Sequence, residues 1–159
     1  MVGGGIMKIV LNRCRGMFEL SKAGLERFIE LKIKSTGYKN VYYYEIVFDK
    51  NGKKHVLISP INITNGKNFV LLTNETFDNV TKLSYDDFKR LSSYLMKSDI
   101  RDDRYDEDLI TVVQELGVLA NTNISNLQVV EIPDSCWVLI DADNGFETLF
   151  YSKSEINRI

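Results

Sequence analysis

The segment that decides the fold class is residues 136–151, CWVLIDADNGFETLFY. Its Asn144-Gly145 pair favours a hairpin turn, and the runs on either side are rich in β-branched and aromatic residues. The segment therefore predicts an antiparallel hairpin. Both faces are apolar, so we expect either a sheet covered on both faces or one face in an oligomer contact. One face carries Val138, Ile140 and Leu149, and the other carries Trp137, Leu139 and Phe150.

Two more Asn-Gly pairs predict hairpins in the middle of the chain. Asn51-Gly52 would form a two-residue type I′ turn that sets Phe48 opposite His55. Asn65-Gly66 suggests another hairpin, which runs to Thr73. The strands expected in this region and at the two ends of the chain are residues 7–12, 41–49, 55–59 and 127–131.

Three segments combine helical periodicity with a suitable capping residue. Ser21, Ser84 and Asp106 each precede apolar residues that recur at a spacing of three and four. In the second segment, Phe88, Leu91 and Leu95 would point inward. The expected helices span residues 21–32, 84–96 and 106–120.

Together these elements predict an α+β fold with a mixed or antiparallel sheet and about three helices. We expect a single domain over residues 1–159, because a chain of this length can bury a sufficient core by itself. Residues 35–100 would form its β-rich middle zone. Residues 1–6 are expected to be a disordered leader, and either Met1 or Met7 is the natural start.

Composition limits the classes of function. The net charge is −2, whereas a protein that binds nucleic acid non-specifically needs a basic surface, so such binding is not expected. No apolar run approaches the roughly 20 residues of a membrane span, and the N-terminus lacks the pattern of a signal peptide. Cys14 and Cys136 do not form a disulfide framework. We therefore expect a cytoplasmic protein that makes no membrane contact.

Catalytic and metal-binding chemistry finds little support in the sequence. His55 is the single histidine, and we expect it to be a strand residue rather than a general base. Cys14, His55 and Cys136 lack the spacing of a zinc site, so no catalytic residue, metal or cofactor is expected. The acidic stretch at residues 102–108 has two interpretations. In the first, it binds a divalent cation for phosphoryl chemistry. In the second, which we prefer, it caps and starts the third helix.

Two features indicate binding. Residues 12–18 follow the first expected strand and lead to a helix N-terminus, where open sheets hold ligands and where backbone amides attract anions. Arg13 and Arg15 add charged donors to this loop. Tyr42 and Tyr44 would share one face of a strand, and tyrosines of this kind suit an interface.

The two ends of the chain carry motifs in a fixed order. Residues 12–21 read Asn-Arg-Cys-Arg-Gly-Met-Phe-Glu-Leu-Ser, and Val-Glu-Ile-Pro-Asp stands at residues 130–134 before Trp137. Between them lie residues 104–109, Gln114-Glu115-Leu116-Gly117 and Ala120-Asn121. These motifs resemble those of an uncharacterised family of small bacteriophage and prophage proteins. The departures from the family pattern are Met17 in place of Gly, Tyr105 in place of Asp and Glu107 in place of Pro.

The resemblance implies a phage or prophage origin and expression in the cytoplasm of a bacterial host, and it supplies no reaction. We expect an accessory binding protein, with counter-defence as one role, that sequesters a nucleotide-type signal or a host protein. The alternatives are a metal-dependent nucleotide-processing or nuclease-like enzyme and a virion assembly component. Self-association into a homo-oligomer is a further option.

The expected ligand site joins the loop after the first strand to the start of the third helix. Arg13, Arg15 and Arg104 would bind a small anionic ligand, because the planar guanidinium matches phosphate or carboxylate, and Phe18 would be an apolar wall. The full set of expected ligand-binding residues is Asn12, Arg13, Arg15, Phe18, Ser21, Arg104 and Asp106, with Tyr42 and Tyr44 as interface residues.

Overall fold

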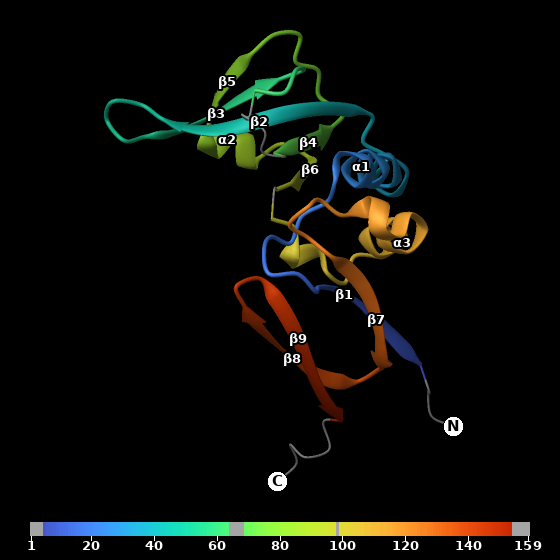
Figure 1. The fold of residues 1–159 in the computed structure, drawn as a ribbon. Coiled ribbons are helices and arrows are strands. Elements are labelled where there is room, and N and C mark those ends of the chain that lie inside the picture. Colours follow the sequence, from blue (N-terminus) through green and yellow to red (C-terminus); the bar gives the residue numbers. More distant parts are fainter. Residues whose placement is uncertain (1–4, 64–68, 98, 154–159) are drawn as a thin grey trace. The chain divides into compact units, whose positions relative to one another are not determined.

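The computed structural model describes residues 5–63, 69–97 and 99–153, which fall into two compact units (Figure 1). Unit 1 combines the chain up to Glu30 with the chain from Asp99 onward, and unit 2 is Leu31–Ser98. The described residues form three α-helices and antiparallel strand pairs, which confirms the predicted α+β class. The single domain stays a prediction.

Unit 1 contains two antiparallel strand pairs. Strand β1 (Ile6–Asn12) pairs with β7 (Leu127–Pro133), and β8 (Cys136–Asp143) forms a hairpin with β9 (Phe146–Lys153). The hairpin turns at Asn144 and Gly145, as predicted, and their φ angles of 51° and 93° fit a type I′ turn. The core of unit 1 includes the fully buried Ile9, Val10 and Leu11 of β1.

The helices of unit 1 begin where their capping residues predict. Helix α1 (Lys22–Thr36) follows Ser21 and continues into unit 2, and α3 (Glu107–Leu116) follows Asp106. Gly117 ends α3 at a positive φ of 55° and starts the short helix η2 (Gly117–Ala120). A second short helix, η1 (Arg101–Asp103), precedes α3.

The predicted leader of residues 1–6 is too long. Ile6 is the first residue of β1 and lies opposite Pro133, and the Asp134 amide donates to the Gly5 carbonyl. Backbone pairing with β7 therefore orders the chain from Gly5 onward. Residues 1–4 lie outside the described residues.

Unit 2 is built on a five-stranded antiparallel sheet with the order β5-β3-β2-β4-β6. Tyr42 and Tyr44 share a face of β2, as predicted, but that face is buried in the core against Phe88 of α2. The Tyr42 hydroxyl accepts from the Phe77 amide, and the Tyr44 hydroxyl donates to a backbone carbonyl. Both side chains are therefore structural in unit 2 and leave little surface for a partner. The elements are β2 (Asn40–Phe48), β3 (Lys54–Ser59), β4 (Val70–Thr73), β5 (Thr81–Ser84), α2 (Tyr85–Lys89) and β6 (Ser93–Met96).

The second predicted helix, residues 84–96, is wrong in its length. Ser84 caps α2 by accepting from the Asp87 amide, but the helix ends after Lys89 and β6 follows. Strand β6 completes the edge of the sheet by pairing with β4, and this tertiary pairing overrides the local helical periodicity. Leu95, which was expected to point inward from a helix, is an exposed strand residue.

The hairpin at Asn51-Gly52 forms, but its turn is wider than the predicted two-residue type I′ turn. The Asp49 amide donates to the Lys53 carbonyl, so three residues form the loop, and Phe48 lies opposite Lys54 rather than His55. The carboxylate of Asp49 accepts from the amides of residues 51 and 53, and Gly52 supplies a φ of 79°. An Asx turn followed by a left-handed glycine therefore sets the register.

The hairpin predicted at Asn65-Gly66 falls outside the described residues and stays a prediction. Strand β4, which ends at Thr73, pairs with β2 and β6. In the sheet, β2 lies between β3 and β4, so those two strands do not form a hairpin with each other.

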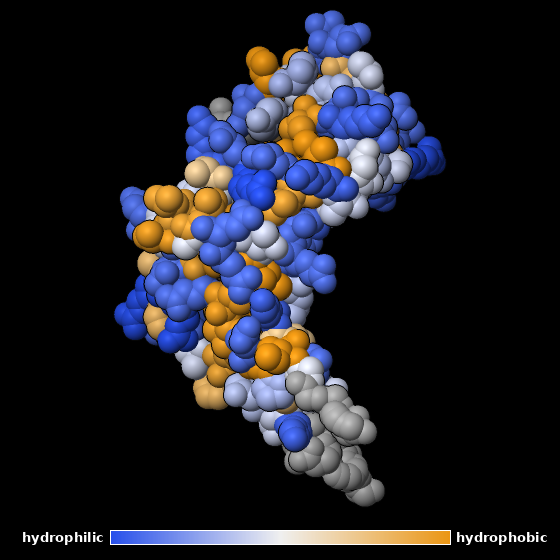
Figure 2. Space-filling view, turned by 90° about the vertical axis from the view of Figure 1, so that its right-hand side faces the viewer, coloured by the Kyte–Doolittle hydropathy of each residue, from blue (hydrophilic) through white to orange (hydrophobic). Residues whose placement is uncertain are grey.

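Apolar side chains remain at the surface, where Figure 2 shows them on one side of the molecule as patches between hydrophilic residues. In unit 1, one face of the β8–β9 hairpin is open: Trp137, Leu139 and Phe150 are 40%, 57% and 50% exposed. The sequence left two explanations for the two apolar faces of this hairpin. The first, that other parts of the sheet cover both faces, is therefore wrong. The oligomer contact stays a prediction. Within the described residues, no helix has the length and apolar character needed to cross a membrane.

Burial raises the pKa of Tyr44 to about 12, with the nearby Tyr85 adding to the shift. A tyrosine in an unfolded chain ionises near pH 10, so the stability linked to its neutral form is complete below about pH 10 and is lost as pH rises through about 12. We expect Tyr44→Phe to remove the last step of the phenolate absorbance titration. An unchanged titration above about pH 11 would contradict this assignment.

Candidate functional site

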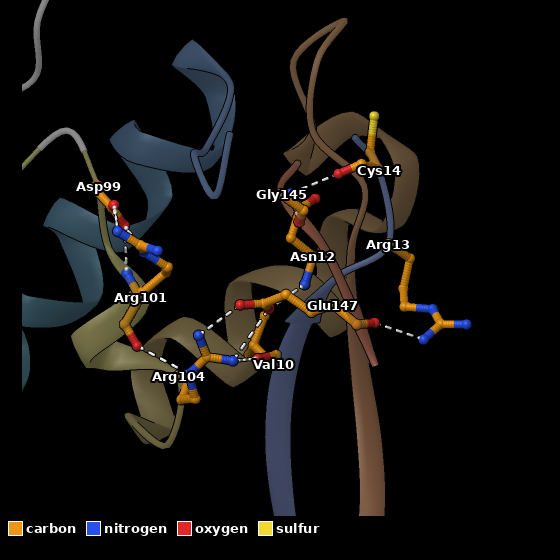
Figure 3. Close-up of polar contacts among 9 residues, drawn as sticks. All are labelled: Val10, Asn12, Arg13, Cys14, Asp99, Arg101, Arg104, Gly145 and Glu147. Atoms are coloured by element: carbon orange, nitrogen blue, oxygen red, sulfur yellow. Dashed lines mark hydrogen bonds and ion pairs between the residues drawn. The ribbon is translucent and has the colours of Figure 1, made fainter. Parts of the chain in front are cut away.

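The loop after β1 is organised by the buried side chain of Asn12 (Figure 3). Its Nδ2 donates to the carbonyls of Cys14 at 3.1 Å and Gly145 at 3.0 Å, and its Oδ1 accepts from the Asn126 amide at 2.9 Å. One side chain thus connects the loop, the β8–β9 turn and the segment before β7. The motif position Asn12 is therefore a structural centre of unit 1.

A buried ion pair lies beside this centre. The guanidinium of Arg104 donates to both carboxylate oxygens of Glu147, at 3.1 and 2.8 Å, and their side chains are only 12% and 4% exposed. Glu147 also accepts from the Asn12 amide at 2.8 Å. Arg104 further donates to the Val10 carbonyl, and its guanidinium lies 5.1 Å from the centre of the Phe18 ring. The pair connects β1, β9 and the start of α3.

The structure brings the three predicted anion-binding arginines into unit 1, but each one contacts the chain itself. Arg104 pairs with Glu147, and an external anion would have to compete with that carboxylate. Arg13 donates to the Glu147 carbonyl at 2.7 Å and lies over the Phe146 ring. Arg15 pairs with Asp143, and both side chains are about two thirds exposed. An anion site at these residues stays a prediction.

The two predicted polar residues at helix starts act as caps. Ser21 Oγ accepts from the Gly24 amide at 3.0 Å and donates to the Leu119 carbonyl at 2.6 Å. Asp106 accepts from the amides of Asp108 and Leu109. These caps occupy amides that an anion would otherwise contact. The acidic stretch therefore starts α3, and Asp102 and Asp103 lie in η1.

Two glycines allow the loop to approach the hairpin turn. A side-chain Cβ on Gly145 would overlap the backbone of Gly16, and one on Gly16 would overlap the Ile124 carbonyl. The Met17 amide donates to the same carbonyl, and the Met17 side chain is partly exposed.

The other candidate residues for chemistry lie in different surroundings. His55 is in unit 2 and contacts Asp49 at 3.1 Å, and hydrogen bonds from Lys53 and then from His55 lower the pKa of the Asp49 carboxyl. Cys14 and Cys136 are free thiols of unit 1. Among the residues that the structure describes, no group of three or more His, Cys, Asp or Glu side chains is placed to hold a metal ion.

A groove of about 610 Å³ is the second candidate site of unit 1. It lies along the first residues of β1, and the contribution of α3 is the single helix face formed by residues 107, 110, 111 and 114. None of its residues was predicted to bind a ligand, although Tyr105 and Glu107 are two of the departures from the family pattern. The groove is lined by Ile6, Met7, Lys8, Tyr105, Glu107, Ile110, Thr111, Gln114 and Asp134.

The groove borders an open strand edge. The Val10 amide donates to the Arg104 carbonyl and the Asn12 amide to Glu147, so both point away from β7. Backbone groups in an antiparallel pair alternate in direction, so those of Ile6 and Lys8 point the same way. No described residue bonds to them on that side. Within the described part of the chain, the backbone donors and acceptors at the start of β1 therefore have no partner on the side that borders the groove.

Comparison of the chain with protein-family models, with curated proteins and with solved structures finds no match. The resemblance to small phage proteins stays a prediction.

Proposed function

We propose that this chain is an accessory binding protein that acts by binding another polypeptide in the cytoplasm of a bacterial host. The observation that carries the proposal is the groove of about 610 Å³ along the open edge of β1. An unpaired strand edge is a template for a further strand, whose main-chain hydrogen bonds give affinity and whose side chains give specificity. A phage-encoded counter-defence protein that holds a host protein in this way fits the resemblance at both ends of the chain.

We prefer a protein partner over a nucleotide signal because the arginines that would bind a nucleotide phosphate already bond to the chain itself. A small anion needs guanidinium groups that are free to bind it, and Arg104 and Arg13 already donate to Glu147 at 2.7–3.1 Å. The strand edge needs no rearrangement of that kind. Its free groups belong to Ile6 and Lys8, and the pocket beside them is already present.

The test uses Lys8→Pro. Because the Lys8 amide points away from β7, proline removes no hydrogen bond of the β1–β7 pair but blocks the open edge. We expect the wild-type protein purified from bacterial cells to carry a polypeptide in its native mass spectrum. Lys8→Pro should weaken this binding about fivefold, since the lost hydrogen bond contributes about 1 kcal/mol.

Two variants serve as controls for Lys8→Pro. Lys8→Ala leaves the backbone edge intact and should keep the polypeptide. Thr111→Trp fills the groove from α3 without changing the strand, and this variant should lose the bound polypeptide. Gln128→Trp places the same side chain on the exposed side of β7 and should keep the polypeptide. A small molecule in place of the polypeptide, or retention by both Lys8→Pro and Thr111→Trp, refutes the proposal.

A further inference from the structure

We propose that the bound segment is extended and carries an apolar residue and a basic residue two positions apart, both facing α3. This inference rests on the proposed function, because it specifies which polypeptide the open edge of β1 selects. Its basis is the order of side chains along the helix face that lines the groove.

That helix face is apolar in one turn and acidic in the next. Ile110 is nearly buried and lies with Met7 and the half-exposed Tyr105 in the groove wall, whereas Glu107 stands one helical turn before it. One turn advances about 5 Å along the helix. Side chains on the same face of an extended strand are about 7 Å apart, so residues i and i+2 of an added strand can meet Ile110 and Glu107.

The charges of the groove favour a basic side chain. Glu107 and Asp134 contribute two carboxylates and Lys8 one ammonium group, so the lining has an excess of negative charge. Neither Glu107 nor Asp134 forms an ion pair with a described residue. Lys8 and Met7 are neighbours on one strand, so their side chains point to opposite faces of that strand.

The test uses two synthetic heptapeptides, Thr-Thr-Val-Thr-Lys-Thr-Thr and Thr-Thr-Val-Thr-Glu-Thr-Thr, titrated separately into the full chain by calorimetry. Exposed ion pairs contribute modestly, so we expect the lysine peptide to bind about three- to tenfold more tightly, with the ratio falling at high salt. Glu107→Lys should reverse the preference. Glu26→Lys makes the same charge change on the exposed side of α1 outside the groove and should keep the preference for the lysine peptide.

The outcomes separate this inference from the proposed function. Equal binding of the two peptides, with both lost in Lys8→Pro, overturns the charge selectivity and leaves the strand-edge function standing. If neither peptide binds and the purified protein carries no polypeptide, both proposals fail. If Glu107→Lys still prefers the lysine peptide, Glu107 is not the residue that selects the basic side chain.

Discussion

Glu147→Ala is expected to lower the free energy of unfolding of unit 1 by about 3–5 kcal/mol, because it leaves the guanidinium of Arg104 buried without its carboxylate. The substitution also removes the acceptor of the Asn12 amide. The measurement is denaturant unfolding followed by the fluorescence of Trp137, which lies in unit 1.

The matched control is Asp143→Ala, which breaks an ion pair of the same type. The Arg15–Asp143 pair is exposed, so its loss should cost at most about 1 kcal/mol. A double variant that also replaces Arg104 by Met should recover part of the loss, since no unpaired charge then remains buried. A cost for Glu147→Ala as small as that of the control would show that the pair does not stabilise unit 1.

This expectation changes how the predicted anion site can be tested. Replacement of Arg104 would destabilise unit 1 by breaking the same pair, so loss of binding in that variant would not identify a ligand contact. Arg15→Ala is the informative variant, because Arg15 is exposed and its ion pair contributes little to stability.

Gly145→Ala is expected to destabilise unit 1 by about 2–5 kcal/mol. The residue has a φ of 93°, and the added methyl group would overlap backbone atoms of Gly16, which cannot move aside as a flexible side chain would. The contact joins the β8–β9 turn to the loop after β1, so the variant should loosen both. The measurement is the free energy of unfolding by denaturant.

Gly52→Ala separates the cost of the positive φ from the cost of the steric overlap. Gly52 lies in the β2–β3 turn at a φ of 79°, and a methyl group there would meet nothing within 4 Å. Its replacement should cost only the backbone strain, about 1–2 kcal/mol. Equal losses for the two glycines would mean that the contact between Gly145 and Gly16 contributes nothing.

The sequence by itself determined the features that depend on neighbouring residues. Asn144-Gly145 identified the turn between β8 and β9, because its residues adopt positive φ with little strain. Ser21, Ser84 and Asp106 identified helix starts, since a cap acts on amides two or three residues away. The α+β class followed from these local signals. The length of the second helix did not, because pairing of β6 with β4 depends on a distant strand.

Only the tertiary structure decided the surroundings of the candidate sites. Glu147 is a single acidic residue in an apolar strand, and that pattern was the available signal of a buried partner, yet nothing in it points to Arg104 43 residues away. The groove likewise joins β1 to a face of α3 about one hundred residues later in the chain. Burial and open strand edges depend on which segments pack together. The fold therefore determined that the three arginines bond to the chain itself and that the start of β1 has an open edge.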